Sequence, residues 1–98
     1  MKVFLDDTRP APNGWIKTKS AEETIQLLQT GKVTQLSLDY DLSATSLDNG
    51  YDVLIWLEEE IKNNKSFSLP INITIHSTHS LLKPRMESAV KNLYKLNK

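Results

Sequence analysis

Four short segments of the chain are rich in apolar and β-branched residues, which predicts β-strands. They are residues 2–5, residues 15–18, a part of residues 33–39, and residues 71–75. In the last segment isoleucines alternate with Asn72 and Thr74. One polar face is typical of a strand at the edge of a sheet.

Three other segments have the apolar spacing of helices. Ser20 and Glu23 form a capping box, an apolar stripe with spacings of four and seven residues begins at Ala21, and Gly31 is placed to end this helix. A second apolar stripe predicts a helix over residues 51–62. Pro84 is suited to the first position of a third helix.

The element order ββαβαβα predicts an α/β fold with a small four-stranded parallel sheet and about three helices, in one domain spanning residues 1–98. Right-handed crossovers with strand order 2-1-3-4 place the two crossover helices on one face. The last helix has no following strand, so handedness does not constrain it. We expect it to cover the second face together with loop 6–14 and Trp15.

Composition limits the class of protein. The 98 residues include no cysteine, and no apolar run approaches the length of about 18 residues that a membrane span needs. These features predict a cytoplasmic protein without a membrane partner. The net charge is zero, but residues 1–60 carry a charge of −6 and residues 61–98 carry +6. The basic part is either a solvated helix or a flank that suits an anionic partner such as RNA.

Acidic residues follow two of the predicted strands at the point where each strand ends. Asp6 and Asp7 follow the first strand, and Asp39 follows the third, with Asp41 close behind. Ligands of open parallel sheets bind beyond the carboxyl ends of the strands, where the strand order reverses. Packed carboxylates repel one another unless a cation neutralises them, so Asp6, Asp7 and Asp39 predict a Mg²⁺ or Mn²⁺ site. The alternative is that the acids only solvate the start of a loop.

Four further residues are candidates for phosphate chemistry beside these acids. Arg9 can grip a phosphate through two donors, His76 at the end of the fourth strand can move a proton, and Ser77 can offer a hydroxyl. His79 is a further candidate for substrate binding, and so is Asp41. Each of them also has a purely structural interpretation, as a solvated side chain or a hydrogen-bonding group.

The acids and the hydroxyl after these strands resemble the receiver domain of two-component response regulators. Residues 20–42 are similar to a receiver's second helix and phosphoacceptor strand, with Asp39 in the phosphoacceptor position. Two receiver elements are missing: a helix between the first two strands, and a fifth strand with its lysine. The fold implied is a truncated, flavodoxin-like receiver.

The chain more closely resembles the cyclic-phosphate processing receiver domain, a compact variant found in bacteria and phages. The resemblance rests on four motifs in order, LDDTRP at 5–10, LDYDL at 38–42, NGYD at 49–52 with Trp56 and Leu57, and IHS at 75–77. The chain departs from the family pattern at Tyr40, His79 and Leu82.

The resemblance and the acids together predict a metal-dependent phosphoesterase that processes cyclic phosphates. The substrate class is a cyclic-phosphate nucleotide or an RNA end, and no DNA partner is predicted. In this hypothesis Asp7 and Asp39 act with the metal, Arg9 and Ser77 hold phosphate, and His76 is the general acid or base that protonates the leaving oxygen.

Two other hypotheses belong to different classes. One is a receiver that is phosphorylated on Asp39, and the other is a non-enzymatic phage or bacterial regulator that binds RNA or nucleotide. A two-histidine phosphoesterase is disfavoured, because only one His-x-Thr element is present, at residues 76–78.

Overall fold

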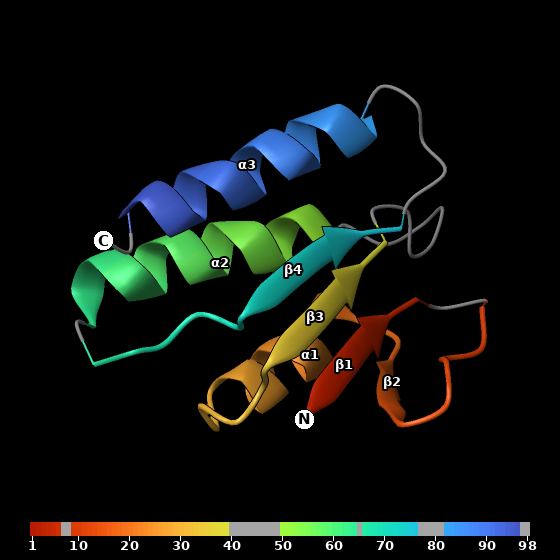
Figure 1. The fold of residues 1–98 in the computed structure, drawn as a ribbon. Helices are drawn as coiled ribbons and strands as arrows, with labels where there is room; N and C mark the ends of the chain where they lie inside the picture. The colour runs from red at the N-terminus through yellow and green to blue at the C-terminus, as the bar shows by residue number, and fades with distance from the viewer. Residues whose placement is uncertain (7–8, 40–49, 65, 77–81, 97–98) are drawn as a thin grey trace.

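A four-stranded parallel sheet forms the centre of the molecule (Figure 1). The computed structural model describes residues 1–6, 9–39, 50–64, 66–76 and 82–96. The strands pair in the order β2-β1-β3-β4, as the sequence predicts, with β4 at an edge. They are β1 (Lys2–Leu5), β2 (Trp15–Thr18), β3 (Gln35–Leu38) and β4 (Asn72–Ile75).

Three helices accompany the sheet, α1 (Ala21–Leu28), α2 (Gly50–Asn63) and α3 (Leu82–Leu96). The predicted cap of α1 is confirmed, because the Glu23 amide donates a hydrogen bond to Ser20 Oγ at 3.1 Å. Pro84 is not at the first position of α3. That helix begins two residues earlier, and proline is tolerated there because the first four amides of a helix have no partner within it. Within the described ranges, no helix combines the length and the hydropathy that crossing a membrane requires.

The hydrophobic core lies between one face of the sheet and all three helices. The strand residues in it alternate along each strand: Val3 and Leu5, Leu36 and Leu38, Ile73 and Ile75. The same buried cluster contains residues of α1, α2 and α3, among them Leu28, Leu57 and Met86. Because side chains along a strand alternate between faces, these helices share one face of the sheet.

The expectation that the last helix covers the second face is wrong. Met86, Val90 and Leu93 of α3 are buried in the same core as the residues of α2. Figure 1 shows α3 beside α2, and α1 behind the sheet. The physical reason is that β4 presents two buried isoleucines at the edge of the helix-covered face, and α3 buries them. The described part of the protein therefore has two layers, and no described helix covers the second face of the sheet.

Candidate metal and phosphate site

Asp6, Asp39 and His76 lie in one row across the sheet, one residue beyond the ends of their strands. The row arises because the last residues of β1, β3 and β4 are in register. Backbone hydrogen bonds continue the register by one step, from the Asp39 amide to the Leu5 carbonyl (3.1 Å) and from the His76 amide to the Leu38 carbonyl (3.0 Å). Parallel strand ends thus bring together residues that are up to 70 positions apart in the sequence.

The imidazole of His76 reaches across β3 toward β1. Its Nε2 lies 3.1 Å from Asp6 Oδ2, and its Nδ1 lies 2.6 Å from Ser37 Oγ. An ionised carboxylate can only accept, so the neutral ring donates from Nε2 to Asp6 and accepts from the Ser37 hydroxyl at Nδ1. A hydroxyl can also accept, so Ser37 suits the opposite tautomer equally well. Ser37 therefore orients the ring whichever nitrogen carries the proton.

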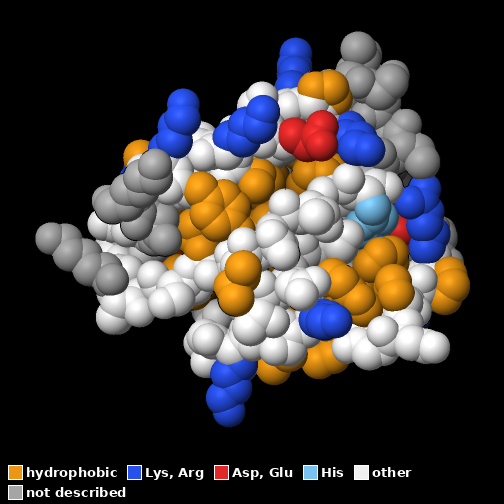
Figure 2. Space-filling model, viewed as in Figure 1, with side chains coloured by type: hydrophobic (Ala, Val, Ile, Leu, Met, Phe, Trp, Pro, Cys, Tyr) orange, Lys and Arg blue, Asp and Glu red, His pale blue; other side chains and the backbone are white. Residues whose placement is uncertain are grey.

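The ring of His76 also stacks on an aromatic side chain. Its centroid lies 4.3 Å from that of Phe4, and the two planes are 7° apart. Figure 2 shows the pale-blue histidine beside hydrophobic side chains on the face of the sheet that the helices leave uncovered. The stacking and the two hydrogen bonds fix both the position and the tilt of the ring.

Arg9 ties the end of β1 to the end of β4. Its amide donates to Asp6 Oδ1 at 3.0 Å, and its Nη1 donates to the His76 carbonyl at 2.9 Å. Its Nε lies 3.8 Å from Asp6 Oδ2, and 44% of the side chain is exposed. A guanidinium has five N–H donors, and Arg9 has further donors for an anion at the surface.

The two carboxylates and the imidazole fit a divalent cation. One ligand atom from each of Asp6, Asp39 and His76 lies within 4.8 Å of the others. Adjacent ligands of an octahedral Mg²⁺ are about 3 Å apart, close to the separation of His76 Nε2 and Asp6 Oδ2. Asp6 is fully buried and Asp39 is 9% exposed, so two acids are largely desolvated at one point. A cation would offset the cost of that arrangement.

Burial lowers the pKa of His76 below its ordinary value of 6.5, because desolvation disfavours the imidazolium. The hydrogen bond to Asp6 and the charges of Asp39 and Asp6 oppose this shift, and the charge of Arg9 adds to it. Desolvation is the largest of these effects. The ring is therefore mainly neutral at pH 7, the form that accepts a proton or binds a metal.

Gly50, the first residue of α2, packs against the backbone of Asp39. A Cβ at position 50 would lie 2.0 Å from the Asp39 carbonyl oxygen and 3.1 Å from Met86 Cε. The first of these distances is far below van der Waals contact. Only glycine lets the start of α2 approach the site this closely.

We expect Gly50→Ala to lower the free energy of unfolding by about 1–3 kcal/mol, because the backbone of α2 or of Asp39 must move. Glycine-to-alanine changes in helices otherwise raise the free energy of unfolding, so a decrease would itself indicate the close packing at position 50. Urea unfolding measures the change, with Ser88→Ala at an exposed position of α3 as the control. A Gly50→Ala protein as stable as the native one would contradict the close packing.

Several predicted site residues lie outside the described residues, namely Asp7, Asp41, Ser77 and His79, together with Tyr40. Of the others, the structure brings Asp6, Asp39, His76 and Arg9 together at one edge of the sheet. The roles assigned to all of these residues stay predictions.

Sequence reasoning missed three residues that shape the site, Phe4, Ser37 and Gly50. A signal for the first two exists in the alternation along the strands. Positions 4 and 6, 37 and 39, and 74 and 76 each share a face, so a polar Ser37 between two leucines marks the face of the acids. Gly50 lies in the NGYD motif at 49–52, but that motif gave no role for it, because its importance comes from the approach of a helix to a strand end.

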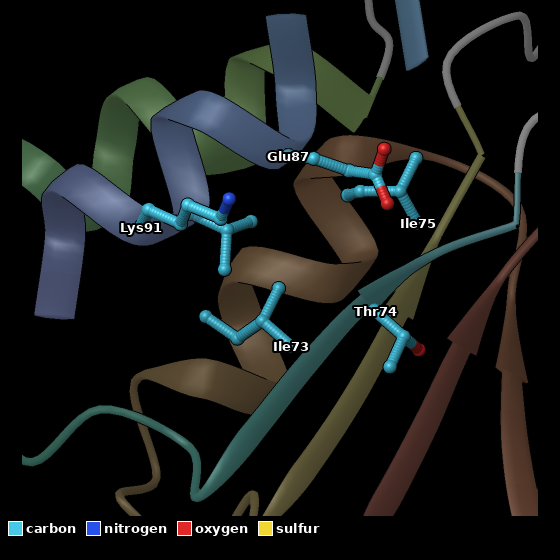
Figure 3. A pocket seen from close by; sticks show the side chains of 6 residues that line it. Ile73, Thr74, Ile75, Glu87 and Lys91 are labelled. Carbon is cyan, nitrogen blue, oxygen red and sulfur yellow. The ribbon is translucent and has the colours of Figure 1, made fainter. Parts of the chain in front are cut away.

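The groove between β4 and α3 is a separate cavity (Figure 3). It has a volume of about 370 Å³ and is lined by Ile73, Thr74, Ile75, Glu87, Val90 and Lys91. Its lining is mainly apolar, with a single carboxylate and a single amine, so it lacks the converging acids found at the strand ends. We therefore place the candidate site at the strand ends.

A comparison with known families identifies a match that covers most of the chain. The family model of the cyclic-phosphate processing receiver domain matches residues 1–92. No curated protein and no solved structure gives a significant match to the chain.

Proposed function

Because the chain belongs to the cyclic-phosphate processing receiver domain family, we propose that it is a metal-dependent phosphoesterase that opens 2′,3′-cyclic phosphates at RNA ends. One observation carries the proposal: Asp6, Asp39 and His76 gather their ligand atoms within 4.8 Å at the strand ends, beside Arg9. Two desolvated carboxylates, an imidazole and a guanidinium are a set suited to a metal and a phosphate.

In this proposal Asp6 and Asp39 hold Mg²⁺ or Mn²⁺, with Asp7 as a further ligand. The ion, when bound, neutralises the phosphate and polarises its oxygens. Asp6 is suited to this task because it is fully buried at the end of β1 and the Arg9 amide fixes its Oδ1. Asp39 is held by its backbone bond to β1 and by the packing of Gly50.

Arg9 binds the phosphate. Its Nη1 is anchored on the His76 carbonyl, so the guanidinium is held at the edge of the site with part of its surface exposed. A pre-oriented guanidinium loses less entropy when it grips a phosphate. Ser77 is proposed to add a hydroxyl donor to the same phosphate.

His76 moves the proton. Its lowered pKa favours the neutral ring, so accepting a proton from the attacking water is better supported than protonating the leaving oxygen. To accept at Nε2, the ring carries its proton on Nδ1 and donates it to Ser37 Oγ, which the 2.6 Å contact permits.

The reaction balances with water as the only co-reactant. The oxygen of water bonds to phosphorus, one of the two ring P–O bonds breaks, and the freed 2′ or 3′ oxygen takes up a proton as a hydroxyl. One proton of water passes to His76, which releases it to solvent after the step, and the proton on the freed oxygen comes from solvent. Strain in the five-membered ring lowers the barrier, so positioning and charge neutralisation supply most of what is needed.

Incubation of the protein with RNA that ends in a 2′,3′-cyclic phosphate, in Mg²⁺ or Mn²⁺, tests the proposal. We expect a phosphomonoester product, and we expect EDTA to abolish its formation. Glu59→Gln, an exposed substitution on α2, is the control and should leave turnover unchanged. Absence of turnover in Mg²⁺ and also in Mn²⁺ would refute the proposal.

The phosphoacceptor hypothesis is distinguished by the intact mass of the protein after exposure to acetyl phosphate. An increase of about 80 Da that disappears in Asp39→Asn would show a receiver that is phosphorylated on that residue. Among the described residues no fifth strand pairs with β4, the position where a receiver carries its lysine strand. For that reason we favour the phosphoesterase.

A further inference from the structure

We infer that the face of the sheet that no described helix covers binds the single-stranded RNA that precedes the cyclic phosphate. The inference rests on the proposed function, because it assigns the substrate of the same site as an RNA chain rather than a free cyclic nucleotide. It starts from the two-layer fold, which leaves this face without a described helix (Figure 1).

Aromatic rings on this face lie beside the site. Trp15 meets Phe4 edge to face, with centroids 6.4 Å apart, and Phe4 in turn stacks on His76. Trp15 is half-buried, whereas Phe4 is covered by its two neighbours. Trp15 is thus the ring that has exposed surface on which a base can stack. It contacts Phe4, which contacts His76, so the three rings form a continuous series.

The charges on the same face suit a phosphate backbone. Lys2 and Lys17 flank the rings, and Lys2 Nζ lies 5.9 Å from the centroid of the Trp15 ring. Within the strands, the other side chains on this face are uncharged: Gln35, Ser37, Asn72 and Thr74. Carboxylates occur only at the strand ends, where the metal is proposed, so along the described strands this face is basic and aromatic.

The combination favours single-stranded RNA over other occupants. Exposed Lys2, Asn72 and Thr74 make the face too polar for an apolar interface with a second copy. Aromatic rings with interleaved cations stack bases and hold phosphates, and half-buried Trp15 offers a surface of this kind beside Lys2 and Lys17. The 2′-hydroxyl that forms the cyclic phosphate specifies RNA.

Binding can be followed through Trp15 itself. In a Trp56→Phe background Trp15 is the only tryptophan, so its fluorescence reports stacking directly. The probe is an oligouridylate of about five nucleotides with a 3′-hydroxyl, which the site cannot turn over. We expect quenching by the oligonucleotide. In Lys17→Gln we expect a lower affinity and a decrease of about one in the slope of log affinity against log salt, because one phosphate contact is lost. Lys95→Gln, the same charge change at an exposed position of α3, is the control and should leave binding as it was.

Turnover gives the second measurement. We expect kcat/KM for an oligonucleotide ending in 2′,3′-cyclic phosphate to exceed that for uridine 2′,3′-cyclic phosphate by about 10- to 100-fold. We expect Trp15→Leu to reduce this ratio.

Three results would overturn the inference: equal kcat/KM values for the two substrates, no quenching of Trp15, or equal losses of affinity in Lys17→Gln and Lys95→Gln. A fluorescence change that depends on protein concentration without RNA would indicate self-association and would overturn it too. If no substrate is turned over but the oligonucleotide still quenches Trp15, the proposed function fails and the RNA-binding face stands.

Discussion

Asp6→Asn is expected to reduce turnover of the cyclic phosphate at least about 10³-fold, because the loss of a charged metal ligand removes several kcal/mol of transition-state stabilisation. Asp6 is the strongest choice because it is fully buried and contacts both Arg9 and His76. Asparagine has the same shape, so the change removes a charge and almost no volume.

The fold should tolerate this substitution. The remaining oxygen of an asparagine can accept from the Arg9 amide, and its NH₂ can donate to His76 Nε2 once the imidazole proton moves to Nδ1 and faces Ser37. Removal of one carboxylate also relieves its repulsion with Asp39. We therefore expect a free energy of unfolding within about 1 kcal/mol of the native value, while activity is lost.

A thermal measurement separates metal binding from catalysis. Mn²⁺ should raise the melting temperature of the native protein, since a ligand that binds only the folded state stabilises it. It should not raise that of Asp6→Asn, and Glu59→Gln should respond as the native protein does. An equal Mn²⁺ shift in Asp6→Asn would place the metal elsewhere, and retained turnover in this variant would remove Asp6 from the chemistry.

The order of strands in the sheet was predictable from the sequence, because the apolar pattern of each segment agrees with its place in the fold. Alternation along residues 71–75 identified an edge strand, and the crossover rule then fixed which face received the first two helices. The position of α3 did not follow from any of these rules. It depends on the isoleucines left at the edge of the core, a packing preference that exists only after the sheet has formed.

The site was predictable to the extent that it depends on strand ends. Asp6, Asp39 and His76 each follow a strand, and a parallel sheet necessarily aligns them. The contacts that fix the His76 ring were not predicted. Alternation places Ser37 and Phe4 on the face of the sheet that points away from the core, the same face as His76. Only the register between the strands shows that the His76 side chain, which projects from the end of β4, reaches both residues.

His76→Gln is the second substitution with a large expected effect. Glutamine can still donate a hydrogen bond to Asp6, but it cannot accept a proton from water, so kcat should fall about 10²- to 10⁴-fold. Ser37→Ala is the matched comparison. It removes only the partner of Nδ1, so we expect a smaller loss, about 10-fold, from a less well oriented ring.

The pH profile distinguishes a base from a structural role. A base must be deprotonated, so kcat/KM of the native protein should fall as the pH drops through the pKa of His76, which burial places below 6.5, and should be level above it. His76→Gln should lack this acidic limb, whereas Ser37→Ala should retain it. Persistence of the limb in His76→Gln would assign the titration to another group.

The leaving group provides a second criterion. If His76 is a base that acts on water, His76→Gln should lower kcat by the same factor for bis(p-nitrophenyl) phosphate, whose leaving oxygen needs no proton. If the loss were confined to the cyclic phosphate, His76 would instead be the acid that protonates the leaving oxygen.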